Sequence, residues 1–132
     1  MDEYTLVNIR ELEDQAPKHG QSPNIEARTA RGPLGLQAAG LGHYRYAPNY
    51  RTFGHKHAEQ EEIYVVLSGS GQAKVGDDIV DLRPWDVLRV SPTTTRGFQA
   101  GPEGLEILAF GSPSDQNRDV ELVSDWWLGK AD

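Results

Sequence analysis

Cysteine is absent from all 132 residues, which excludes disulfide bonds and thiolate metal ligands. Basic residues are also scarce, since 13 Lys and Arg stand against 20 Asp and Glu, for a net charge of -7. This balance disfavours non-specific attraction to nucleic acid or to an anionic membrane. The longest wholly apolar run, Ile63 to Leu67, is far too short to cross a bilayer.

The N-terminus shows no basic end followed by an apolar stretch, so no signal peptide is expected. The absence of cysteine suits a reducing compartment. We therefore expect a cytoplasmic protein with neither nucleic acid nor membrane as a partner. A chain of this length fits one domain with a real hydrophobic core.

Glycine and proline are present in number, with 14 Gly and 8 Pro spread along the chain. Such spacing indicates many short strands joined by tight turns, with at most one or two short helical turns. The pattern predicts an all-β sandwich or barrel. The strand candidates within it are residues 4–9, 24–31, 34–47, 51–57, 63–67, 72–75, 79–82, 87–90 and 105–110.

The stretch from Gly54 to Gly71 carries the chemistry that stands out in this sequence. His55 and His57 are one residue apart, so they point to the same side of an extended strand. Glu62 follows a short polar connection and opens the apolar run. Two imidazoles and a carboxylate are a ligand set that suits iron, manganese, nickel or zinc, with positions left open for water or substrate.

At these positions the chain resembles the cupin superfamily of small jelly-roll β-barrels. Its first motif is a Gly, then His-x-His, then a Glu, then an apolar strand that ends in Gly, and His55, His57, Glu62 and Gly69 match it. In the second motif Pro84, Asp86 and Pro92 match. Trp85 stands where Gly is usual, and Arg96 stands where the family has its fourth ligand, a His.

The resemblance spans about residues 34–111 and implies a cupin barrel there. Residues 1–33 would then be edge strands and loops that pack on the barrel, and residues 112–132 a C-terminal tail. Cupins include dioxygenases, isomerases, decarboxylases and effector-binding modules, so the resemblance implies a site at the barrel mouth but no particular reaction. Single-barrel cupins are often dimers, and the resemblance implies a homodimer here as well.

Arg96 leaves two functions open. In the first, His55, His57 and Glu62 hold a divalent metal ion, and the protein is a metal-dependent enzyme of the dioxygenase or isomerase kind. In the second, no metal binds, and a bidentate bridge between Arg96 and Glu62 fills the centre of a binding module. A divalent ion and an inward guanidinium repel each other, so both together would need another anion, besides Glu62, between them.

No catalytic residue is assigned, with Tyr64 and Arg96 as candidates. The expected substrate-binding residues are Arg96, which would orient an anionic group, Tyr64, which shares the face of Glu62, and Phe53 and Phe98, which lie two residues from His55 and Arg96. Alternation turns either His43 with Arg45 or Tyr44 with Tyr46 toward the interior, and the sequence leaves that register open.

Overall fold

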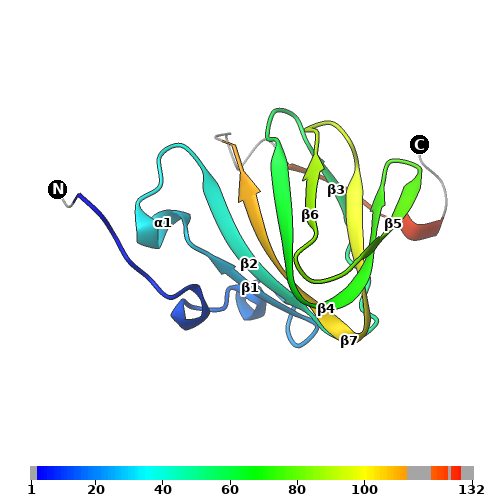
Figure 1. The fold of residues 1–132 in the computed structure, drawn as a ribbon, viewed down its shortest axis with the longest axis horizontal. Coiled ribbons are helices and arrows are strands. Elements are labelled where there is room, and N and C mark those ends of the chain that lie inside the picture. Colours follow the sequence, from blue (N-terminus) through cyan, green and yellow to red (C-terminus); the bar gives the residue numbers. More distant parts are fainter. Residues whose placement is uncertain (1–2, 113–119, 125, 129–132) are drawn as a thin grey trace.

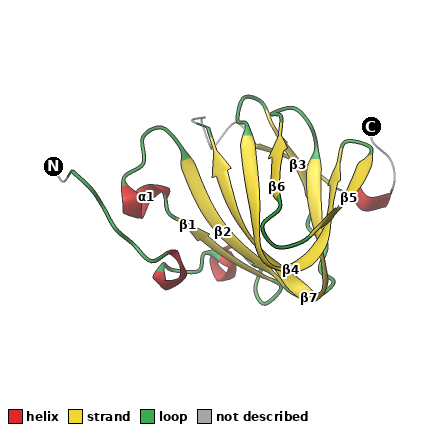
Figure 2. Ribbon diagram, in the orientation of Figure 1, coloured by secondary structure: helices red, strands yellow, loops and turns green. Residues whose placement is uncertain are grey.

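A computed structural model describes residues 3–112, 120–124 and 126–128. Strands dominate, and they form one hydrogen-bonded sheet that curls on itself into a jelly-roll barrel (Figures 1 and 2). In chain order the elements are η1 (Ile9–Glu11), η2 (Ala16–His19), β1 (Ile25–Thr29), α1 (Arg31–Leu34), β2 (Gly40–Tyr46), β3 (Gly54–His57), β4 (Glu62–Val75), β5 (Asp78–Leu82), β6 (Val87–Val90), β7 (Arg96–Gly111), β8 (Val120–Val123) and η3 (Trp126–Leu128).

Strand β7 lies at the centre of the sheet. It pairs antiparallel with β2, β3 and β4, while β1 extends the sheet beyond β2 and β8 extends it beyond β3. β5 and β6 both pair with β4. The jelly-roll prediction is confirmed. Within the described residues the chain makes four helical turns of three or four residues each, instead of the one or two expected.

Two glycine-rich segments that the sequence suggested as turns lie inside long strands. β4 runs through Gly69 and Gly71, and β7 runs through Gly101 and Gly104. The register between the two strands shifts on both sides of Gly69, so the pair bends there without ending. Gly69 has a φ of 78°, and a Cβ on it would collide with the carbonyl oxygen of Gly104. Glycine therefore allows a sharp bend in a continuous strand pair.

The interior of the barrel holds a series of aromatic rings. Tyr44 and Tyr46 point inward, which settles the register that the sequence left open, and their rings stack 6.3 Å apart. Phe98 lies against Tyr46 at 6.4 Å and against Tyr64 at 4.8 Å. Buried Val66 and Ile107 complete this part of the core. The rings thus form one wall behind the mouth of the barrel.

The opposite face of β2 and β7 carries a buried polar cluster that holds the N-terminal segment. Glu106 is only 4% exposed and accepts hydrogen bonds from Arg10 at 2.7 Å, from His43 at 2.6 Å and from Ser68 at 2.8 Å. Burial acts to raise the pKa of Glu106, but these contacts outweigh it and hold the pKa below its usual value. The ion pair between Arg10 and Glu106, together with the pairing of β1 with β2, holds the N-terminal residues on the barrel.

The C-terminal segment is part of the sheet, although the sequence suggested only a tail. All four residues of β8 pair with β3, whereas β7 pairs with β3 only at His55 and Arg96. Beyond β8, Trp126 is 2% exposed and lies against two glycines. A Cβ on Gly54 would be 2.7 Å from the indole, and one on Gly97 would be 3.1 Å from it. The domain boundaries 34–111 and 112–132 stay a prediction.

No helix in the described ranges combines the length and the apolar character needed to span a bilayer.

Replacing Gly69 by Ala should lower the free energy of unfolding by about 2–4 kcal/mol, because the new methyl group meets the Gly104 carbonyl and the backbone has a positive φ. Urea denaturation measures the change. Gly32→Ala is the matched control, since nothing lies within 4 Å of its Cβ position. Equal stability of the two variants would contradict the close approach of β4 and β7.

Candidate metal centre

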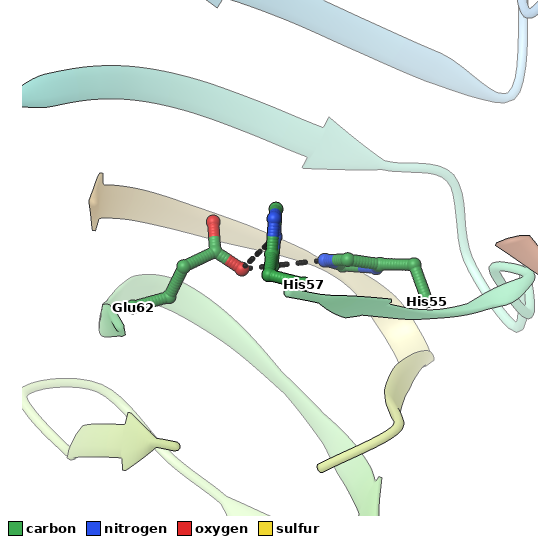
Figure 3. A group of neighbouring side chains, drawn as sticks. All are labelled: His55, His57 and Glu62. Carbon is green, nitrogen blue, oxygen red and sulfur yellow. Dashed lines mark hydrogen bonds and ion pairs between the residues drawn. The ribbon is translucent and has the colours of Figure 1, made fainter. Parts of the chain in front are cut away.

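His55, His57 and Glu62 converge inside the barrel on two elements. The histidines come from β3, where alternation places both rings on the inner side, and Glu62 is the first residue of β4. Oε1 of Glu62 lies 3.3 Å from Nε2 of His55 and 3.0 Å from Nε2 of His57 (Figure 3). The pair of strands therefore brings together the three side chains that the sequence proposed.

The donor atoms are spaced as the ligands of one metal ion would be. One ligand atom from each of the three residues can be chosen so that all lie within 4.8 Å of one another. Two ligands of an ion bound at about 2.1 Å are roughly 3.0–3.4 Å apart, which matches the two histidine–carboxylate distances. The donor set fits iron, manganese, nickel or zinc, and the fit does not choose among them.

Tyr64 and the histidines keep the Glu62 carboxylate ionised. Burial acts to raise the pKa of Glu62, but hydrogen bonds from His55, His57 and Tyr64, together with the attraction of His55, lower it well below its usual value. The Tyr64 hydroxyl donates to the same oxygen, Oε1, and burial followed by the nearby carboxylate raises its own pKa. Tyr64 is therefore a neutral donor, and Glu62 is a charged acceptor ready for a cation.

Arg96 is fully buried, and on β7 it is the strand partner of His55. Its Nε is 3.8 Å from Oε1 of Glu62 and has no hydrogen-bond partner among the described residues. Its terminal nitrogens donate to the carbonyl oxygens of Pro92 at 3.4 Å and Ser91 at 3.3 Å. The two side chains thus form a loose ion pair without the bidentate bridge of the metal-free alternative, and Arg96, His55 and His57 all approach the same carboxylate oxygen.

A cavity of about 900 Å³ opens onto the three candidate ligands. Its volume is at the upper end of the range for sites that enclose a small organic molecule. Besides His55, His57 and Glu62, the wall includes Arg31 and Leu36 of the segment around α1, and it also includes Gln21, Thr29, Gly32, Gly35, Gln37, Gly40, Leu41, Gly42, Tyr44, Gln60, Ala109, Gly111, Val120 and Leu122.

The four expected substrate-binding residues are not on this wall. Tyr64, Phe98 and Arg96 are at most 4% exposed and belong to the core behind the ligands. Phe53 is 68% exposed, because β3 begins only at Gly54 and the alternation that would turn Phe53 inward does not reach it. Their part in substrate binding stays a prediction, and Tyr64 and Arg96 act on the site through Glu62.

Sequence reasoning missed the residues that do line the cavity away from the ligands. Arg31 and Gln37 lie in and just after α1, whereas the sequence predicts that they belong to two strands, residues 24–31 and 34–47. No motif or period marks this segment, so no local signal could have found it. Tyr44 was considered, but its direction depended on a register that only strand pairing decides.

No protein-family model matches this chain. Among proteins of known sequence, MJ1618 of Methanocaldococcus jannaschii is 28% identical over 74 residues. That match covers 55% of this chain and 59% of the relative, so the shared part spans little more than half of either protein.

Solved structures define the class of fold. A cupin protein from Bacteroides fragilis superposes with a TM-score of 0.70 at 20% identity, covering 87% of this chain and 88% of that one. A protein with a double-stranded β-helix domain from Klebsiella pneumoniae superposes with a TM-score of 0.71 at 15% identity, covering 91% of this chain and 97% of that one. A salicylate 1,2-dioxygenase variant from Pseudoaminobacter salicylatoxidans, in complex with gentisate, superposes with a TM-score of 0.67 at 13% identity. The match covers 81% of this chain and 32% of that one. The chain has the cupin fold.

Removing the Trp126 indole should weaken metal binding although it is not a ligand. Trp126 donates to the Lys74 carbonyl at 3.3 Å, and its own carbonyl accepts from Lys74 Nζ at 2.7 Å, which fixes the segment that flanks β3. Trp126→Ala should lower the free energy of unfolding by about 3–5 kcal/mol, and Trp126→Phe should lower it less. In the Phe variant the affinity for Mn²⁺ or Zn²⁺, measured by calorimetry, should fall.

Trp85→Ala is the control for this experiment, because Trp85 is 77% exposed. Unchanged stability and metal affinity in both Trp126 variants would show that β3 does not depend on the C-terminal segment.

Proposed function

We propose that this protein is a metal-dependent cupin enzyme that acts on a small, oxygen-containing anionic molecule. His55, His57 and Glu62 hold a divalent transition metal, and the cavity beside them receives the substrate. The observation that carries the proposal is the convergence of two imidazole nitrogens and one ionised carboxylate at one end of an open cavity. A bound divalent ion would supply Lewis-acid activation of a substrate oxygen.

The anionic character of the substrate is supported by charge and by a fold neighbour. The salicylate 1,2-dioxygenase that shares this fold holds gentisate, which is an aromatic carboxylate. In the present chain a divalent ion would carry two positive charges and Glu62 would neutralise only one of them. An anionic group on the substrate would balance the remainder. The homodimer and the cytoplasmic location stay predictions.

One observation favours a metal-free alternative, in which the barrel binds a small molecule without catalysis. Arg96 lies within ion-pair range of Glu62, so the carboxylate already has one cation beside it. The orphaned Nε and the length of this contact argue for the metal-dependent function, because a permanent bridge would be shorter and bidentate.

The proposal is tested by elemental analysis of protein purified without chelators or affinity metals, followed by titration with Mn²⁺, Fe²⁺, Ni²⁺ and Zn²⁺. We expect bound metal and a higher melting temperature on loading. Glu62→Gln should weaken binding by about 100-fold or more, since even outer-sphere changes cost 10–100-fold. Glu61→Gln, which alters a surface pair with Arg89, should bind like the wild type. Wild-type protein with neither metal nor a thermal response would refute the proposal.

Arg96→His tests the electrostatic argument separately. The substitution replaces a buried cation beside Glu62 with a neutral ligand side chain, so metal affinity should rise by at least about tenfold. Arg96→Gln removes the charge without adding a ligand and should produce a smaller rise. Both variants lose the hydrogen bonds to Pro92 and Ser91, so their melting temperatures are measured as well. Unchanged affinity in both would show that Arg96 does not oppose the metal.

A further inference from the structure

We propose that Arg31 is the substrate-binding residue that sets specificity, by holding a carboxylate at the end of a substrate whose other, oxygen-bearing end reaches His55, His57 and Glu62. The inference rests on the proposed function, and it names both the class of substrate and the residue that selects it. The class is a hydroxylated acid with a carboxylate at each end, one held by Arg31 and the other directed to the metal ligands.

The first argument is the charge of the cavity wall. Among the described residues that line it, Arg31 is the only Lys or Arg and Glu62 is the only Asp or Glu. With neutral histidines the wall carries no net charge, and with a divalent ion in place it carries two positive charges. The chain as a whole has a net charge of -7, so this cavity would be a locally positive site on an acidic protein. Such a site attracts an anion with two negative groups.

The second argument is that the Arg31 side chain has no partner. Within the described ranges it makes no hydrogen bond and no ion pair, although it is half-buried. Two other arginines already have partners. Arg28 donates hydrogen bonds to Glu26 and to the Leu12 carbonyl, and Arg96 forms an ion pair with Glu62. A guanidinium presents a planar fork of donors that fits a carboxylate, so the free one on the wall is the group to bind it.

The third argument is position. Arg31 is the first residue of α1, which connects the end of β1 to the start of β2 (Figure 1). Gly40 pairs with Gly111, which pairs with Glu62, so the metal ligands and the α1 segment share one end of the barrel. From β1 the path to β4 crosses β2 and β7, which is about 14 Å along the sheet at roughly 4.8 Å per step.

That separation requires a substrate with several atoms between its two ends. The polar groups on the same wall include Thr29, Gln21 and Gln37, which offer hydroxyl and amide partners to substrate hydroxyls. A cavity of about 900 Å³ has ample room for a six-carbon acid. These features favour a hydroxylated acid over a purely apolar one.

The test compares two probes that differ only in the group at one end. Glucarate has a carboxylate at each end of a six-carbon hydroxylated chain, whereas gluconate has one carboxylate and one alcohol. Binding of each to the metal-loaded protein is measured by calorimetry. We expect wild-type protein to bind glucarate about 10–100-fold more tightly, the usual range for one charged hydrogen-bonded contact. Arg31→Gln should remove that preference and leave metal affinity unchanged, and Arg31→Lys should restore part of it.

Arg83→Gln is the matched control, because Arg83 is exposed and lies away from the cavity wall. It should keep the wild-type preference. Melting temperatures of all variants should match the wild type, since Arg31 makes no side-chain contact that folding depends on. The inference is overturned if metal-loaded wild type binds neither probe, if it binds both equally, or if Arg31→Gln keeps the preference. Failure of the wild type to bind metal refutes the proposed function itself, and with it this inference.

Discussion

One oxygen atom, Oε1 of Glu62, is the point on which the site depends. Two imidazoles, the Tyr64 hydroxyl and the Arg96 guanidinium all face it, so a buried carboxylate stays ionised in the wall of an apolar core. An ionised carboxylate beside two imidazole nitrogens is a cation site by its chemistry. Its partners also fix the orientation of the carboxylate.

The strand that carries both histidines is held mainly from the end of the chain. β3 has four residues, and β7 pairs with it at a single position, whereas β8 pairs with all four. Trp126 lies over Gly54 at the start of β3, where only glycine leaves room for the indole. Residues more than sixty positions beyond the histidines therefore position them. The ligand strand and the C-terminal segment act as one structural unit.

The wall of the cavity carries one charged residue of each sign among the described residues. On the described wall Glu62, beside His55 and His57, is the one acidic residue and Arg31 is the one basic residue. The core residues Tyr64, Phe98 and Arg96 support the ligands from behind and do not reach the wall. Residues of α1 and the segment after it, Arg31, Leu36 and Gln37, lie on the wall in their place.

The sequence by itself predicted the cupin fold, through the resemblance over residues 34–111. It also predicted the grouping of His55, His57 and Glu62, because motif spacing and strand alternation are local properties of the chain. It also put Arg96 at the position of the family's fourth ligand and left its pairing with Glu62 open. Only the tertiary structure decided the direction of Tyr44, the exposure of Phe53 and the place of Arg31 on the cavity wall. These depend on which strands pair and in what register, and pairing joins residues far apart in the chain whose contacts no local pattern encodes.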